Sequence, residues 1–141
     1  MVSSGSARLG LPLDHVGVAV RTLDEGSRPY QLLGLTRDGD DEEVAAQGVR
    51  VRVLRSGESR VELLEPTSPG SPLVKFLEKR GPGVHHLAFR VDDLDAEIQR
   101  LQAEGAPFID PEPKPGRHGT RVVFLHPSWA GGVLVELVEH P

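Results

Sequence analysis

The chain contains no cysteine and few aromatic residues: one tryptophan, one tyrosine and four phenylalanines among 141 residues. Without cysteine it can form no disulfide, no thiolate zinc site and no cysteine nucleophile. No stretch approaches the roughly 20 apolar residues that a membrane helix needs. The first ten residues, MVSSGSARLG, have no apolar segment of the kind that secretory signals carry. We therefore expect no membrane partner and a cytoplasmic location.

An excess of positive charge is also absent. Aspartate and glutamate number 21 against 16 lysines and arginines, and the net charge is −5. The basic residues are scattered along the chain, which disfavours nucleic acid as a partner. The length suits one domain with its own core. We expect residues 1–10 to form a flexible tail.

An internal repeat organises the rest of the chain. With an offset of 71 residues, His15 falls on His86, Val20 on Val91 and Gly34 on Gly105. Near the end the offset grows to 74, where Glu62 matches Glu136, because a longer loop follows His126. The repeat predicts one domain over 11–141, with a first module at 11–66, a linker at 67–81 and a second module at 82–141.

Each module has the pattern of a strand, a helix and three further strands. Alternating valines predict the first strand, and Thr22 followed by Glu25 is a capping box that predicts a helix start. Pro29 should leave this helix kinked or short. Valine-rich and leucine-rich segments predict strands at 49–55, 60–65, 120–126 and 133–138, and a short helix is expected at 72–80. The fold class is therefore α+β, with two tandem βαβββ modules forming a curved, partly open eight-stranded sheet around a cleft.

Two histidines and two glutamates stand out as candidate metal ligands. Strand alternation places His15 and His86 on the face with small neighbours, opposite the bulky residues. Glu62 and Glu136 each lie within an apolar strand, where a carboxylate is costly unless it is paired or binds a metal. The repeat relates the two pairs by a pseudo-twofold axis. Together they offer two nitrogens and two carboxylates to one divalent ion, such as Co²⁺, Mn²⁺, Ni²⁺ or Zn²⁺.

Other polar residues carry weaker signals. His85 should point toward the helix side and be structural, and the acidic cluster from Asp38 to Glu43 should be a solvated loop. The glycine pairs match no phosphate-binding loop, because no convincing helix follows them.

Five segments resemble the methylmalonyl-CoA epimerase family, which belongs to the vicinal oxygen chelate superfamily with glyoxalase I, bleomycin-resistance proteins and extradiol dioxygenases. They are LDHVGVAV (13–20), QGVRV (47–51), SPLVKFLEKRGPGVHHLAFRVDDLDA (71–96), FLHP (124–127) and GGVLVEL (131–137). The resemblance places the family's metal ligands on His15, Glu62, His86 and Glu136. Where the chain has Glu62, some epimerases have glutamine, and where some have a glutamate base the chain has Val51.

The resemblance also implies an activity and its participants. The family inverts the carbon between the carboxylate and the thioester of methylmalonyl-CoA, through an enolate that a metal stabilises. It implies an acyl-CoA substrate, one divalent ion with Co²⁺ preferred, and a homodimer. Glu136 is expected to be one base, and Glu62 is its tentative counterpart on the other face.

Three alternatives share the fold. A glyoxalase I-like lyase would use the same ligand set on a glutathione hemithioacetal. A drug-binding module of the bleomycin-resistance kind would need no metal. A dioxygenase would need two histidines and one carboxylate around iron.

Overall fold

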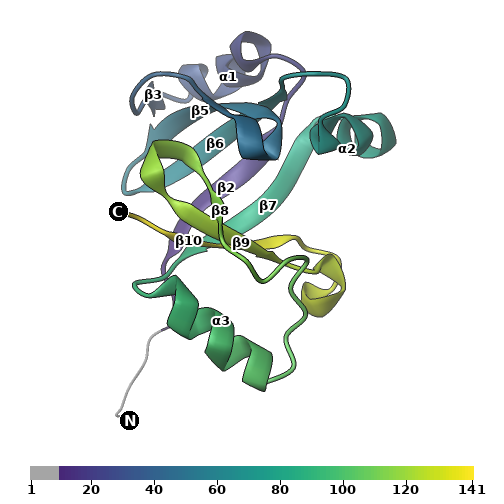
Figure 1. Ribbon diagram of the computed structural model, residues 1–141. Helices are drawn as coiled ribbons and strands as arrows, with labels where there is room; N and C mark the ends of the chain where they lie inside the picture. Colours follow the sequence, from purple (N-terminus) through teal and green to yellow (C-terminus); the bar gives the residue numbers. More distant parts are fainter. Residues whose placement is uncertain (1–9) are drawn as a thin grey trace.

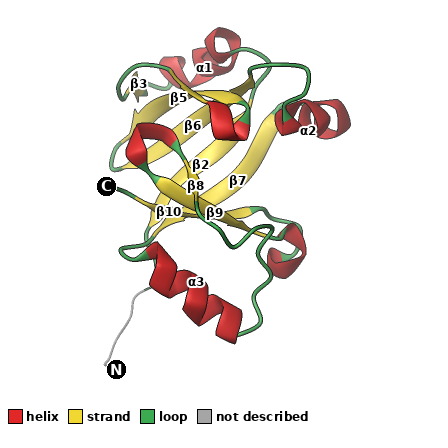
Figure 2. Ribbon diagram, viewed as in Figure 1, coloured by secondary structure: helices red, strands yellow, loops and turns green. Residues whose placement is uncertain are grey.

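The computed structural model describes residues 10–141, so all but one residue of the expected tail lies outside the described part. A curved sheet runs through the molecule, with α1 and α2 toward one end and α3 at the other (Figure 1). The strands lie between these helices (Figure 2). None of the helices in residues 10–141 has the length and apolar character that crossing a membrane requires.

The elements follow the repeat. The first module contains β2 (Leu13–Ala19), α1 (Leu23–Leu32), β3 (Thr36–Arg37), β4 (Glu42–Val44), the 3₁₀ turn η1 (Ala45–Gln47), β5 (Val49–Ser56) and β6 (Ser59–Pro66). Helix α2 (Pro72–Arg80) connects it to the second module. That module contains β7 (Gly83–Arg90), α3 (Leu94–Ala103), β8 (Lys114–Pro115), η2 (Arg117–Gly119), β9 (Arg121–Leu125), η3 (Pro127–Ala130) and β10 (Val135–Glu139).

The α+β fold with two βαβββ units is confirmed. The strand order is β3-β5-β6-β2-β7-β10-β9-β8, and β4 also pairs with β5. The described sheet has nine strands where the sequence predicts eight. The additional strand is β3, which is two residues long, and its counterpart in the second module is an isolated bridge between Phe108 and Leu125.

The two modules meet along β2 and β7, which pair antiparallel at the centre of the sheet. His15 lies opposite Ala88, and Gly17 lies opposite His86. Because each pair becomes the other under the 71-residue offset, a pseudo-twofold axis passes between these strands. Outside them, β2 runs parallel to β6 and β7 runs parallel to β10.

Helices α1 and α3 cover one face of the sheet. Val18 and Val20 pack with Leu23 of α1 and with Leu54 and Leu63 of the neighbouring strands. Helix α3 packs in the same way against the second module. The bulky residues of the alternating strands therefore lie under helices, as predicted, and the opposite face carries the candidate ligands beside α2, whose Leu73 and Leu77 pack on it.

The N-terminal cap of α1 forms as predicted, because Thr22 Oγ1 accepts a hydrogen bond from the Glu25 amide at 3.2 Å. The expectation that Pro29 would shorten α1 was wrong, because α1 has ten residues, as many as α3. Arg52 of β5 supports α1 from below by donating to the Leu23 carbonyl at 3.2 Å and to Ser27 Oγ at 3.0 Å. These contacts secure the helix although Pro29 removes one of its backbone donors.

Candidate active site

A small cavity lies on the sheet face that α1 and α3 leave uncovered. His15, His86, Glu62 and Glu136 all line it, together with apolar side chains such as Val51. Its volume is about 20 Å³, which is room for about one water molecule. All four predicted site residues are buried, with exposed fractions of 4–5%.

Three of these four residues bring their ligand atoms to one point. His15 Nε2, His86 Nε2 and Glu136 Oε1 lie 3.1 Å from one another. Metal–ligand bonds of about 2.0–2.2 Å place neighbouring ligand atoms roughly 3–3.5 Å apart. Glu136 Oε1 is buried and accepts no hydrogen bond from any described residue. A buried carboxylate oxygen without a donor, between two imidazole nitrogens, fits a divalent cation.

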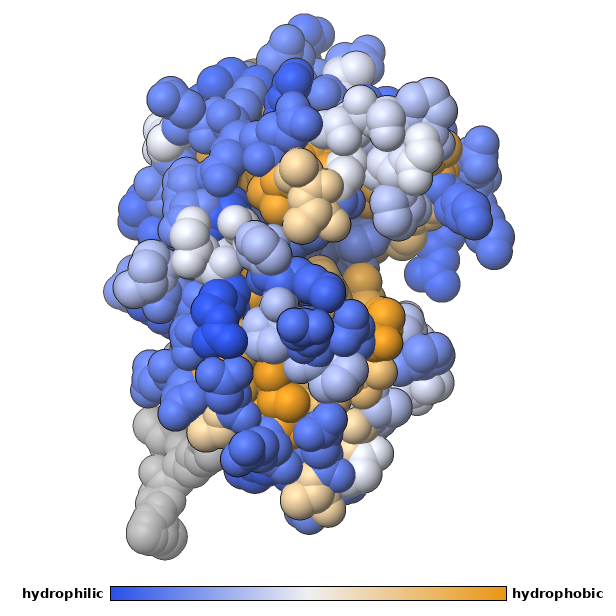
Figure 3. All heavy atoms as spheres, in the orientation of Figure 1, coloured by the Kyte–Doolittle hydropathy of each residue, from blue (hydrophilic) through white to orange (hydrophobic). Residues whose placement is uncertain are grey.

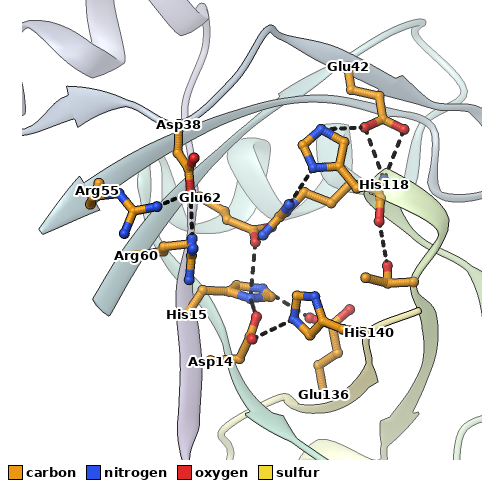
Figure 4. A network of polar contacts seen from close by, with 12 residues as sticks. Asp14, His15, Asp38, Glu42, Arg55, Arg60, Glu62, His118, Glu136 and His140 are labelled. Carbon is orange, nitrogen blue, oxygen red and sulfur yellow. Dashed lines mark hydrogen bonds and ion pairs between the residues drawn. The ribbon is translucent and has the colours of Figure 1, made fainter. Parts of the chain in front are cut away.

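The fourth residue, Glu62, lies on the other side of the His15 ring (Figure 4). Its Oε2 atom is 3.1 Å from His15 Nδ1 and 2.7 Å from Arg117 Nε. Glu62 therefore approaches the same histidine as Glu136 does, but through the opposite ring nitrogen.

The side chains of this buried cluster shift one another's pKa values strongly. Burial by itself would lower the pKa of His15, but contacts with Asp14 and Glu136 and the charge of Glu62 raise it to about 10. Burial by itself would raise the pKa of Glu136, but the His86 charge and the contact with His15 lower it to about 2. A proton on His15 thus supplies the positive charge that the surrounding carboxylates require.

Asp14 fixes the orientation of His15. Its Oδ2 atom lies 2.7 Å from His15 Nδ1, and its Oδ1 atom lies 2.7 Å from His140 Nε2. A carboxylate at one ring nitrogen leaves the other nitrogen for a metal. Sequence reasoning missed Asp14 and His140; the Asp-His dipeptide of the first strand was the only available signal.

His85 has a larger role than strand alternation predicts. Its ring packs against Phe76 of α2, with ring centroids 5.0 Å apart, on the sheet face opposite α1 and α3, so the expected position on their side was wrong. A β-bulge in the pairing of β2 and β7 also brings its Nδ1 within 2.9 Å of His86 Nδ1. Burial and the neighbouring His86 lower the pKa of His85 to about 4, so the ring is neutral at pH 7.

A segment of the second module crosses to the first module over the cavity. Arg117 pairs with Glu62, and the backbone amide of His118 donates to both carboxylate oxygens of Glu42 at 3.1 and 3.2 Å. His118 adopts a left-handed conformation with φ of 51°. This costs energy for a residue other than glycine, and the contacts with β4 offset that cost. Sequence reasoning also missed Arg117.

The acidic cluster 38–43 is not the solvated loop that was expected. Asp38 pairs with Arg55 and Arg60, and Asp41 binds the buried Arg52 through two nitrogens at 2.9 and 2.8 Å. Arg52 lies under α1, where its charge requires acidic partners.

A second, larger cavity adjoins the first beside His86. Its volume is about 410 Å³, and its lining is mostly apolar, with Leu73, Phe124 and Leu134 among the residues that form it. Elsewhere, the face shown in Figure 3 is mostly hydrophilic, with apolar side chains in small patches. The larger cavity can therefore hold an elongated, partly apolar ligand beside the buried cluster.

Comparisons with known proteins agree with this geometry. The family model of the glyoxalase/bleomycin resistance protein/dioxygenase superfamily matches residues 14–124. The mitochondrial methylmalonyl-CoA epimerase of Dictyostelium discoideum is 38% identical over 128 residues, which cover 90% of this chain and 77% of that protein. The chain belongs to the methylmalonyl-CoA epimerase family.

Solved structures of this epimerase family have the same fold. The methylmalonyl-CoA epimerase of Mycobacterium tuberculosis superposes with a TM-score of 0.89 and 38% identity, covering 96% of this chain and 93% of its own. A methylmalonyl-CoA epimerase in complex with methylmalonyl-CoA and NH₄⁺ gives a TM-score of 0.84 and 36% identity, covering 92% and 94%.

Proposed function

We propose that this protein is a metal-dependent epimerase that inverts methylmalonyl-CoA at the carbon between the carboxylate and the thioester. Membership of the epimerase family supports the reaction. The observation that carries the proposal is the buried Oε1 atom of Glu136, which accepts no hydrogen bond from residues 10–141 and lies 3.1 Å from the Nε2 atoms of both histidines. Such an atom suits a site that binds a cation and exchanges a proton.

His15, His86 and Glu136 would hold the ion. Glu62, which lies at the opposite ring nitrogen of His15, would join them by turning away from Arg117. When bound, the divalent ion supplies positive charge that stabilises a substrate enolate. Asp14 keeps the Nε2 atom of His15 directed toward the other two ligands.

Proton transfer is assigned to the two glutamates. Glu136 is ionised at neutral pH, since His86 and His15 lower its pKa to about 2, and its role as the group that accepts the α-proton is assigned from its family position. Glu62 approaches from the other side of the His15 ring and is the candidate for the opposite face of the substrate. Val51 lines the cavity where some family members have a glutamate, and it offers no proton acceptor.

The resemblance supports three further parts of the proposal. Co²⁺ is the expected ion, ahead of Mn²⁺, Ni²⁺ and Zn²⁺, and the expected assembly is a homodimer in the cytoplasm. Metal analysis and sedimentation of the purified protein measure the first two directly.

The test is α-proton exchange of methylmalonyl-CoA in D₂O, followed by NMR, with purified protein of measured metal content. We expect interconversion of the two epimers together with deuterium incorporation. His15, His86 and Glu136 form the proposed ligand triangle. His86→Ala should remove most of the bound metal and the activity, because it deletes one of these three ligands. Full metal occupancy in that variant would contradict the assigned site. Turnover of a methylglyoxal–glutathione adduct without methylmalonyl-CoA exchange would contradict the reaction.

A further inference from the structure

The Arg117–Glu62 ion pair breaks the symmetry of the site. Glu62 and Glu136 occupy equivalent strands, since Glu62 lies beside Gly17 on β6 and Glu136 beside Ala88 on β10. Only Glu62 has an arginine partner, at 2.7 Å, because the residue of the first module that corresponds to Arg117 is Ala46. The ion pair between an arginine and the strand glutamate is therefore present in one module and not in the other.

Arg117 is largely but not fully buried and has unused hydrogen-bonding capacity. Its side chain is 11% exposed and lines the same cavity as the ligand triangle. Nε donates to Glu62, and Nη1 lies 2.9 Å from His118 Nδ1. Nη2 makes no hydrogen bond with any residue in the described part of the chain. A guanidinium frequently binds a carboxylate through two nitrogens. Because Glu62 contacts Nε alone, the Nη2 group remains able to donate to another acceptor.

We propose that Arg117 recognises the free carboxylate of the acyl-CoA substrate, and that Glu62 occupies this place until the substrate arrives. The identity of the substrate rests on the proposed function. The cavity has room for only about one water molecule in its present form, at about 20 Å³, so a substrate carboxylate can enter only if a side chain gives way.

Exchange of one carboxylate for another has a small electrostatic cost. The guanidinium remains paired throughout, which avoids an uncompensated buried charge. Glu62 does not lose all its partners on leaving, because its Oε2 atom is already 3.1 Å from His15 Nδ1. The contacts of His118 with Glu42 hold the segment that carries Arg117 in place.

The test compares two ligands of similar shape. Isobutyryl-CoA has a methyl group where methylmalonyl-CoA has its carboxylate, so the ratio of their dissociation constants measures carboxylate recognition. The ratio is determined by calorimetry on wild-type protein and on Arg117→Ala, Arg117→Lys and Glu62→Gln, each with measured metal content. Arg28→Ala is the matched control, because Arg28 is exposed and its substitution removes the same charge from a position outside the cavity.

Arg117→Ala should weaken methylmalonyl-CoA binding by about tenfold to a hundredfold, the range for a charge-assisted hydrogen bond, and leave isobutyryl-CoA nearly unchanged. Arg117→Lys should lose less affinity for methylmalonyl-CoA, because lysine keeps the positive charge although it cannot bind a carboxylate through two nitrogens. Glu62→Gln should increase the preference for methylmalonyl-CoA, since a neutral amide competes less strongly for Arg117. Arg28→Ala should keep the wild-type ratio.

Three results would overturn the proposal. Unchanged dissociation constants for both ligands in Arg117→Ala would show that the substrate carboxylate binds elsewhere. Equal weakening of both ligands would show that Arg117 only braces its loop. A reduced preference in Glu62→Gln would contradict the exchange of carboxylates. If the wild-type protein does not interconvert the epimers, the proposed function fails, while the ratio still decides whether Arg117 recognises a carboxylate on a CoA thioester.

Discussion

Asp14 and His85 occupy equivalent positions in the two modules, and each is the additional residue of a β-bulge between β2 and β7. Each places a polar atom against the Nδ1 atom of the following histidine: Asp14 Oδ2 lies 2.7 Å from His15, and His85 Nδ1 lies 2.9 Å from His86. The repeat therefore keeps the position of the supporting residue but changes its charge. One histidine of the proposed ligand set faces an anion, and the other faces a neutral ring.

Asp14→Asn should weaken metal binding. The amide cannot supply the negative charge that orients His15, and loss of such a supporting carboxylate typically lowers metal affinity by about 10–100-fold. Calorimetric titration of the metal-free protein with Co²⁺ measures the change. Asp110→Asn removes an exposed carboxylate at the second cavity, away from the three proposed ligand atoms, and should retain the wild-type metal affinity. Equal affinities in both variants would show that Asp14 does not orient His15.

Gly17→Ala should displace His86. A Cβ atom at Gly17 would lie 2.1 Å from His86 Cε1 and 2.6 Å from its Nε2, so the imidazole has to leave the ligand triangle. We expect loss of most metal binding and activity, measured by metal analysis and by α-proton exchange. Gly83→Ala is the matched control on β7, because a Cβ there meets no atom within 4 Å. Normal metal content in Gly17→Ala would contradict this account of the close contact.

The repeat made much of this structure predictable. A constant offset that pairs His15 with His86 implies equivalent strands, and equivalent strands imply a twofold axis with both histidines beside it. Alternation then places the valines under the helices. Even the change of offset before Glu136 has a physical basis, because η3 (Pro127–Ala130) occupies the longer loop.

Features that break the repeat or the alternation could not be predicted in this way. The bulges at Asp14 and His85 shift side chains relative to strict alternation, and no turn residue marks them in the sequence. Arg117 reaches Glu62 across 55 residues of sequence, and its counterpart Ala46 gives no hint of a cation. Arg52 lies where the second module has Val123, so a charged residue replaces an apolar one beneath a helix.

Asp41→Asn should destabilise the first module. It replaces the two-nitrogen ion pair of the buried Arg52 by a neutral partner and leaves Asp24, at 3.0 Å, to balance the guanidinium, which should lower the free energy of unfolding by about 1–3 kcal/mol. Denaturant unfolding at pH 7 measures this loss. Asp40→Asn is the matched control, because Asp40 is exposed and makes no hydrogen bond or ion pair with any residue in the described part of the chain.

The same ion pair predicts a pH dependence. The hydrogen bonds from Arg52 lower the pKa of Asp41 below its ordinary value. The resulting stabilisation is present above the ordinary aspartate pKa of about 4 and is lost as the pH falls through the lowered value. The stability difference between wild type and Asp41→Asn should therefore shrink on acidification. A difference that stays constant down to the acid transition would contradict the assignment.

Glu136→Gln should separate metal binding from proton transfer. The amide keeps the shape of the side chain and an oxygen that can coordinate, but it removes the carboxylate that accepts the proton. The variant should retain part of its metal and lose epimerisation by a factor of at least ~10², the usual contribution of general acid–base catalysis. Glu62→Gln should be milder, because the resemblance places glutamine at this position in some epimerases. Deuterium incorporation measured from each epimer separately should show the loss of one base as a larger defect from one epimer than from the other. If Glu136→Gln exchanges protons at the wild-type rate while holding its metal, Glu136 is a ligand alone, and the base has to be another group that lines the cavity.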